Sequence, residues 1–253
     1  MVDLTEKMVH FIFAGRNMVN DITLLKSISL FDGLTDEQIL HFVDHIKGKL
    51  VCTKKNDFIL NSATNDEKLA GILVSGSALV VQDNIWGDRL ILDYIQPSAC
   101  FGEVFSIQQE YNPFSVIAKE DSTSFIFEAN RILKPCSPNC PHYDYLVANF
   151  IKVIIQKSHR LIDKVTYSCQ RSTRAKIMAF LSTYAEEKGS LSFDIPFNRQ
   201  ELADYLGVDR AAMSVVLSEL KEEGYINYNK NSFVIIKKST PPTQYRNKGL
   251  GSY

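Results

Sequence analysis

The chain has 253 residues, of which 45% are hydrophobic and 23% are charged, so it suits one large globular domain or two modest ones. Its formal net charge of −1 excludes a polycation, and any contact with DNA has to come from local placement of charge. No apolar run approaches the ~18 residues of a membrane-spanning helix, and Asp3 and Glu6 stand where a signal peptide would be basic. We therefore expect a cytoplasmic protein without a membrane partner.

Residues 1–19 form an extension to which we assign no role, and residues 20–46 follow a helical pattern. Within this pattern Thr35 and Gln38 stand three positions apart, like the two members of a capping box at the start of a helix. We expect a helix to begin directly after Thr35.

Between Lys49 and Phe127 the pattern changes to short β-rich runs that are separated by turn signals. The runs are Phe58–Leu60, Ala70–Val74, Ala78–Gln82, Arg89–Tyr94, Ser115–Ala118 and Ser124–Phe127. Their regular spacing predicts an antiparallel β-roll or barrel within a domain of residues 20–141.

None of the five histidines (His10, His41, His45, His142 and His159) lies in this β-rich stretch, so we expect no histidine-ligated catalytic metal in the barrel. A Gly-rich phosphate loop, a nucleophile elbow and an HExxH motif are also missing from the sequence, so we do not expect an enzyme. His41 and His45 lie one helical turn apart, and we interpret both as solvated surface residues.

Cys136, Cys140 and His142 follow the β-rich stretch in a Pro-rich connector and are weak candidates for a metal site. A fourth ligand would have to come from elsewhere, with Cys100 or Cys169 as candidates. The spacing is not one of the strong zinc patterns, and thiols are commonly buried as small apolar groups, so we favour a structural role and assign no metal. Five cysteines, odd in number and scattered, favour reduced thiols over a disulfide framework.

Residues 142–168 contain no Gly or Pro and predict one long helix, which is followed by a second helix over Thr173–Lys188. The apolar spacing of the long helix is close to a coiled-coil seam. Because the helix separates two globular parts, we expect it to pair with its own copy in a two-fold homodimer, while part of its face packs on the chain's own barrel. The residues expected in the dimer helix contact are Leu146, Phe150, Val153, Ile154 and Leu161.

Residues 169–238 carry the pattern of two short helices joined by a tight turn. Asn198 and Glu201 form a capping box at the start of the first helix. Gly207 suits a left-handed turn, and Asp209 caps the second helix. Apolar residues recur in the second helix at i, i+3, i+4 and i+7, which predicts a buried stripe of Met213, Val216, Leu217 and Leu220.

The opposite face of the second helix is small and polar, and it is basic near its N-terminal end. Its residues are Arg210, Ala211, Ser214, Ser218 and Lys221. Such a face suits the major groove of DNA, because small residues let the backbone approach and Arg210 can reach a guanine edge or a phosphate. The alternative is an ordinary helical hairpin with a solvated face.

The segment Tyr225–Lys238 contains two β-rich runs around the turn signal Asn229-Lys230-Asn231, which predicts a hairpin. A helix-turn-helix followed directly by a hairpin is a winged helix. The basic residues that can touch phosphates from this wing are Lys230, Lys237 and Lys238. Residues 239–253 follow as a polar tail.

The order of a β-barrel, a long helix and a winged helix-turn-helix resembles the Crp/Fnr family of bacterial transcription regulators. The likeness is most specific at Ser75-Gly76-Ser77, at Phe101-Gly102-Glu103 and over Asn198–Ile226. It implies an α+β fold with an N-terminal antiparallel β-roll of the cyclic-nucleotide-binding type, a dimerisation helix and a C-terminal winged helix-turn-helix domain.

The resemblance also implies a function and a set of site residues. The function is that of a homodimer that binds an inverted repeat in double-stranded DNA, works with RNA polymerase and responds to a small-molecule effector at the β-roll. The residues implied for DNA binding are Arg199, Gln200, Asp209, Arg210, Ala211, Ser214, Val215, Ser218 and Lys230. The residues implied for the effector pocket are Phe101, Gly102, Glu103, Phe114 and Ser115.

Two departures from the family pattern concern the effector. Where the members that bind cyclic AMP carry an Arg-Ser pair, this chain has Phe114-Ser115, and Phe114 cannot neutralise a phosphate. We therefore expect an effector other than cyclic AMP. The oxygen-sensing members carry a cysteine cluster before the barrel, whereas no cysteine here precedes Cys52, which argues against an iron–sulfur cluster.

A third departure concerns the DNA target. The Arg-Glu…Arg base readers of the family become Arg210-Ala211…Val215, so we expect a target sequence that differs from the best-known one. The main alternative function is a ligand-binding or interaction protein whose winged helix contacts a protein partner instead of DNA.

Overall fold

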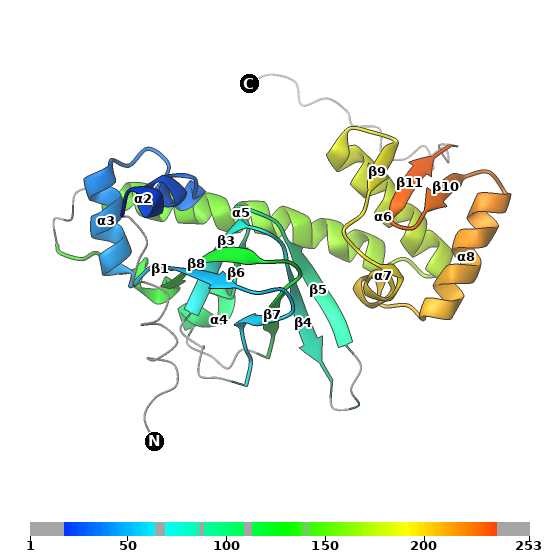
Figure 1. The fold of residues 1–253 in the computed structure, drawn as a ribbon, viewed down its shortest axis with the longest axis horizontal. Coiled ribbons are helices and arrows are strands. Elements are labelled where there is room, and N and C mark those ends of the chain that lie inside the picture. The colour runs from blue at the N-terminus through cyan, green and yellow to red at the C-terminus, as the bar shows by residue number, and fades with distance from the viewer. Residues whose placement is uncertain are drawn as a thin grey trace. The chain divides into compact units, whose positions relative to one another are not determined.

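The computed structural model describes residues 18–63, 69–84, 86, 89–108, 113–138, 140 and 142–236, and the chain divides into two compact units, Met1–Ile162 and Asp163–Tyr253 (Figure 1). Helix α5 (Tyr143–Ser168) passes from the first unit into the second. The predictions for residues 1–17, for Lys237 and Lys238 and for the tail lie outside the described residues.

The first unit begins with helical elements, as the sequence predicts. They are α2 (Met18–Lys26), the 3-10 turn η1 (Ser29–Phe31) and α3 (Asp36–His45). The capping box of α3 is confirmed: the Gln38 backbone N–H donates to the Thr35 hydroxyl over 3.4 Å, and the Thr35 backbone N–H donates to the Gln38 side chain over 2.9 Å.

The predicted antiparallel roll is confirmed as two four-stranded sheets, in the orders β1-β8-β3-β6 and β2-β7-β4-β5. The sequence did not predict the strands Lys49–Thr53 and Cys100–Phe101 or the helix Glu103–Gln108. The first strand has no clear alternation of apolar and polar residues, and the other two elements are very short. The strands are β1 (Lys49–Thr53), β2 (Phe58–Leu60), β3 (Leu69–Ser75), β4 (Ala78–Asp83), β5 (Arg89–Ile95), β6 (Cys100–Phe101), β7 (Ser115–Ala118) and β8 (Ser122–Glu128). Helix α4 (Glu103–Gln108) follows β6, and the 3-10 turn η2 (Ala129–Arg131) follows β8.

Among the described residues of this unit, buried apolar side chains form one core on each face of the first sheet. Strand β8 shows why: Ile126 points between the two sheets, while its neighbours Phe125 and Phe127 point to the opposite face. That opposite face packs against α2, α3 and the N-terminal part of α5, which Figure 1 shows beside one another. The chain segment between η2 and α5 therefore lies close to α3.

The expected dimer seam on α5 needs correction. Leu146, Phe150 and Val153 are buried in the core of their own unit, where the Phe150 ring lies 6.3 Å from that of Phe127. Ile154 packs partly against the same core, so only Leu161 of the five expected residues is well exposed. The spacing revealed an apolar face, but a helix sequence does not say which surface covers that face.

The second unit is a small helical domain with a three-stranded sheet in the order β10-β11-β9. Its helices are α6 (Thr173–Lys188), α7 (Arg199–Leu206) and α8 (Arg210–Glu222), and its strands are β9 (Ser192–Asp194), β10 (Ile226–Asn229) and β11 (Ser232–Ile235). The predicted bounds of α6 are confirmed, and Ser172 caps its start by accepting from the Ala175 N–H over 3.1 Å. The winged helix-turn-helix fold is confirmed as well.

Candidate nucleic-acid interface and effector site

The turn between α7 and α8 is built by local capping. The Asn198 side chain accepts from the Glu201 N–H over 3.0 Å, and the Glu201 carboxylate accepts from the Asn198 N–H over 2.7 Å. Gly207 ends α7 with φ +60°, a left-handed conformation that favours glycine. Asp209 then caps α8 by accepting from the Ala212 N–H over 2.8 Å. These contacts confirm the predicted caps and hold α8 at a defined angle to α7.

Helix α8 has one buried side and one open side. Met213, Leu217 and Leu220 are buried, and Val216 is half-buried. The open side has small or polar residues near the helix start, and all of the following are exposed: Arg210, Ala211, Ser214, Val215 and Ser218. The predicted division of faces is therefore confirmed, and the open side is available to a macromolecular partner.

The two serines on this open side have local hydrogen bonds. The Ser214 hydroxyl donates to the Arg210 carbonyl over 2.9 Å, and the Ser218 hydroxyl donates to the Ser214 carbonyl over 3.1 Å. Because each hydroxyl donor is used within the helix, the oxygen presents its acceptor lone pairs outward. Such serines suit a donor on the partner, for example the amino group on the edge of adenine or cytosine.

The wing places Lys230 at its tip. Asn229 pairs with Ser232 across the hairpin, so the turn itself is Lys230-Asn231, and Lys230 is exposed with φ +51°. A positive charge at the tip of a wing suits a phosphate contact.

Arg199, at the first turn of α7, has a packing role that the sequence did not indicate. Its guanidinium carbon lies 4.7 Å from the ring centre of Tyr228 and 5.1 Å from that of Phe233, two residues that face each other across the wing. Burial among these rings lowers the pKa of the Arg199 guanidinium from its ordinary value. Arg199 thus joins α7 to the wing, whereas neighbouring Gln200 is exposed and donates to Asp204 over 2.7 Å.

In the first unit, Phe101 belongs to the core and does not line an open pocket. It is fully buried between the two sheets, and a Cβ at Gly71 would lie 2.3 Å from its ring. Gly102 follows with φ +77°, and a Cβ there would lie 2.9 Å from the Leu69 carbonyl oxygen. Glycine is therefore required at both positions, and Gly102 turns the chain so that α4 can start at Glu103.

Glu103 faces helix α5. Its side chain is 4% exposed, and the Lys157 ammonium donates to both carboxylate oxygens over 2.8 and 2.9 Å. Lys157 is itself only 14% exposed at the side chain. A close pair with this little solvent is screened weakly, so the contact is an electrostatic link between α4 and α5.

Phe114 and Ser115 lie where the related pattern carries Arg-Ser. The Phe114 ring packs edge-on against Phe105 of α4 with 5.3 Å between centres. The Ser115 hydroxyl lies 3.1 Å from the Ser62 hydroxyl and accepts from the Ser62 N–H over 3.2 Å. The surroundings of Phe114 are therefore aromatic, which is unlike the charged setting that a phosphate needs.

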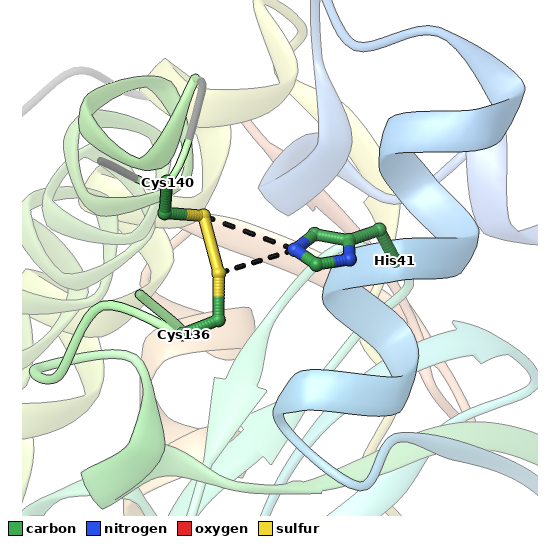
Figure 2. A group of neighbouring side chains, drawn as sticks. All are labelled: His41, Cys136 and Cys140. Atoms are coloured by element: carbon green, nitrogen blue, oxygen red, sulfur yellow. Dashed lines mark hydrogen bonds between the residues drawn. A yellow bond between two sulfur atoms is a disulfide. The ribbon is translucent and has the colours of Figure 1, made fainter. Parts of the chain in front are cut away.

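The cysteines differ from the sequence expectation in two ways. Cys136 and Cys140 form a disulfide, so these two thiols are not reduced in the structure. Their third partner is His41 on α3, whose Nε2 lies 3.1 Å from the Cys136 sulfur (Figure 2). His142, the expected partner, is exposed with its ring 5.9 Å from that of Tyr145. Only the tertiary fold could reveal His41, because 95 positions separate it from Cys136.

Comparison with known proteins agrees with this architecture. A family model for the cyclic nucleotide-binding domain matches residues 51–138, and a model for the Crp-like helix-turn-helix domain matches residues 175–239. The chain belongs to the Crp/Fnr family. A curated Crp/Fnr relative is the transcriptional activator protein FnrL of Cereibacter sphaeroides, which is 33% identical over 76 residues. This match spans 26% of the chain and 31% of FnrL, less than a third of that relative's length.

Solved Crp/Fnr structures share the fold at low sequence identity. A CooA mutant from Carboxydothermus hydrogenoformans has a TM-score of 0.62 at 15% identity, with 81% of this chain and 88% of that chain covered. The c-di-GMP-responsive global regulator CLP of Xanthomonas campestris has a TM-score of 0.60 at 16% identity, with 81% and 100% covered. Among the residues that the structure describes, no helix combines the length and apolar character needed to cross a membrane.

Proposed function

We propose that the chain is a homodimeric, sequence-specific DNA-binding regulator of transcription that senses a small-molecule effector at its N-terminal roll. The observation that carries the proposal is the open side of α8, which is held by a capped turn and presents Arg210 at the helix start. In the major groove, Arg210 would read a guanine or hold a phosphate, and Ala211 would contact a thymine methyl. We assign the protein to the cytoplasm, with RNA polymerase as a further partner.

We place the dimer contact on the exposed apolar side of α5. Ile151, Ile155 and Ile162 are 52%, 50% and 62% exposed, and their spacing of four and seven residues matches a coiled-coil seam. Leu161 borders this stripe and is also exposed. Two copies joined along the stripe would present two α8 helices to successive major grooves, which predicts an inverted repeat as the target.

The proposed effector acts on the roll and reaches α5 through α4. Helix α4 carries both Phe105, which packs on Phe114, and Glu103, which pairs with Lys157. A ligand that shifts α4 would therefore change a contact on the dimer helix. The aromatic surroundings of Phe114 support a less charged effector, and neither cyclic AMP nor an iron–sulfur cluster is our candidate.

The experiment that tests this function is selection of binding sites from random duplex DNA with the purified full-length chain, followed by a salt titration on the enriched site. We expect an inverted repeat and an affinity that falls steeply with salt, because phosphate contacts release counterions. The selection is repeated with added small-molecule extract, so that a regulator that requires its effector is detected as well. Failure to enrich any sequence in both arms would exclude a sequence-specific regulator.

A second candidate function follows from the charge of the winged-helix segment. Residues 169–238 carry ten Lys or Arg against nine Asp or Glu, a balance that also suits contact with a protein. In that case affinity for duplex DNA would be weak and would hardly change with salt, and the same titration separates the two functions.

A further inference from the structure

His41, Cys136 and Cys140 form a cluster that the proposed regulatory function does not use. Figure 2 shows the His41 ring directed from α3 towards the two sulfur atoms, which belong to the connector between η2 and α5. The Nε2 atom lies 3.1 Å from the Cys136 sulfur and 3.8 Å from the Cys140 sulfur. All three residues belong to the first unit, and His41 and Cys136 are exposed while Cys140 is half-buried.

The connector is tied to α3 at a second point, one helical turn away. The His45 Nε2 lies 2.8 Å from the Lys134 carbonyl oxygen and 3.1 Å from the Arg131 carbonyl oxygen. The His45 ring N–H is shared between these two carbonyls and fixes the start of the connector. At the other end of the connector, the Tyr143 hydroxyl donates to the Ile132 carbonyl over 2.7 Å. These contacts bring the cysteines to His41 without using any atom of the cluster itself.

The donor atoms and their spacing suit a thiophilic metal ion. Two thiolates and one imidazole are ligands that zinc prefers, and a tetrahedral zinc site with ordinary bond lengths separates nitrogen from sulfur by about 3.6 Å. The two observed nitrogen–sulfur distances, 3.1 and 3.8 Å, bracket this value. All three donor atoms lie within 4.8 Å of one another. The exposure of His41 and Cys136 leaves a fourth position for water or a solute.

We propose that the reduced chain binds one zinc-type divalent ion through His41 Nε2, Cys136 Sγ and Cys140 Sγ, and that the disulfide is the metal-free oxidised state. Reduction by a dithiol breaks the Cys136–Cys140 bond: two electrons and two protons pass to the two sulfurs, and the dithiol becomes a disulfide. Metal binding then releases the two thiol protons. In the reverse direction a disulfide oxidant takes two electrons from the thiolates and two protons from solvent and becomes a dithiol, while the Cys136–Cys140 bond forms and the ion leaves. The bound ion would clip the connector before α5 to α3.

The test uses the full-length chain, reduced with a dithiol, desalted without oxygen and titrated with Co²⁺ as a spectroscopic probe. Thiolate-bound tetrahedral cobalt has sulfur-to-metal charge-transfer absorption, which hexaaqua cobalt lacks, and its ligand-field bands are much stronger than the weak ones of hexaaqua cobalt. We expect saturation at one Co²⁺ per chain, displacement by Zn²⁺, and no binding by the oxidised chain. A reduced chain that shows no thiolate–cobalt absorption would overturn the proposal, and so would an oxidised chain that binds as well as the reduced one.

Variants separate this site from other thiols and histidines. We expect His41→Ala to weaken Co²⁺ binding at least tenfold. We expect Cys136→Ser to abolish the absorption spectrum of cobalt bound by both the Cys136 and the Cys140 thiolates. The matched controls are His142→Ala, which removes the histidine nearest in sequence, and Cys169→Ser, which removes another exposed thiol; both should bind as the parent chain does. If His142→Ala lowered the affinity for Co²⁺ as much as His41→Ala does, the assignment of His41 as a ligand would be contradicted. Since neither outcome involves DNA, the result does not depend on the regulatory function.

Discussion

Lys157 of helix α5 donates to both carboxylate oxygens of Glu103, over 2.8 and 2.9 Å, and the Glu103 side chain is almost fully buried. Glu103 is the last residue of the Phe-Gly-Glu motif that resembles the effector site of Crp/Fnr proteins. The motif's carboxylate therefore serves as a link to the helix that leads to the winged domain. An effector at the roll would meet a carboxylate that already has a cationic partner.

The first prediction concerns the strength of this link. Removing one partner of a buried pair leaves an uncompensated charge, so Lys157→Met and Glu103→Gln should each lower the free energy of unfolding by about 3 kcal/mol. The double variant should recover part of this loss, because no buried charge is then left unpaired. Denaturant unfolding at fixed protein concentration measures the free energy of unfolding of the parent chain, the two single variants and the double variant. Strictly additive losses would show that the two residues act independently.

The second prediction concerns the exposed stripe of α5. If the proposed homodimer forms along this stripe, Ile155→Asp should weaken it and, with it, binding to the proposed inverted repeat, because a charge enters an apolar contact. Gln156→Asp places the same acid one position away, on another exposed side of the helix, and should leave the dimer intact. Sedimentation velocity measures the dimer fraction of the two variants. An unchanged dimer in Ile155→Asp would move the interface elsewhere.

The third prediction concerns the proposed DNA contacts of α8. Arg210→Ala should cost about 1–3 kcal/mol at the best site and relax the preference at one base pair in each half-site. Binding to the selected duplex and to variants at each position provides the measurement. If the loss is the same on selected and random duplexes, Arg210 contacts phosphate only. Glu222→Ala, at the other end of the exposed side, is the matched control.

The fourth prediction concerns thiol reactivity. Burial raises the pKa of the Cys100 thiol, and the nearby Glu103 carboxylate adds to the increase. Because a raised pKa keeps the thiol protonated at neutral pH, Cys100 should resist alkylation in the folded chain, while the exposed Cys52 and Cys169 should react. Mass spectrometry of labelled peptides measures this, with the denatured chain as the control. Rapid labelling of Cys100 under native conditions would show that its site opens easily.

The sequence by itself determined the parts that local signals encode. The caps at Thr35, Asn198 and Asp209, the left-handed Gly207 and the buried stripe of α8 all depend on residues within a few positions of one another. Helix and turn chemistry acts over that same range, so these predictions are confirmed nearly residue by residue. The β-roll followed from the spacing of turns, although the two-residue strand β6 was too short to carry a pattern.

Only the tertiary structure decided which surfaces and side chains meet. The apolar stripe of α5 could not say that Leu146 and Phe150 enter the unit's own core while Ile155 stays exposed. Nor could any local pattern pair Glu103 with Lys157, 54 positions away, or bring His41 to Cys136. Such pairings depend on how the sheets and helices stack, and stacking is set by the whole set of buried side chains and not by any short segment.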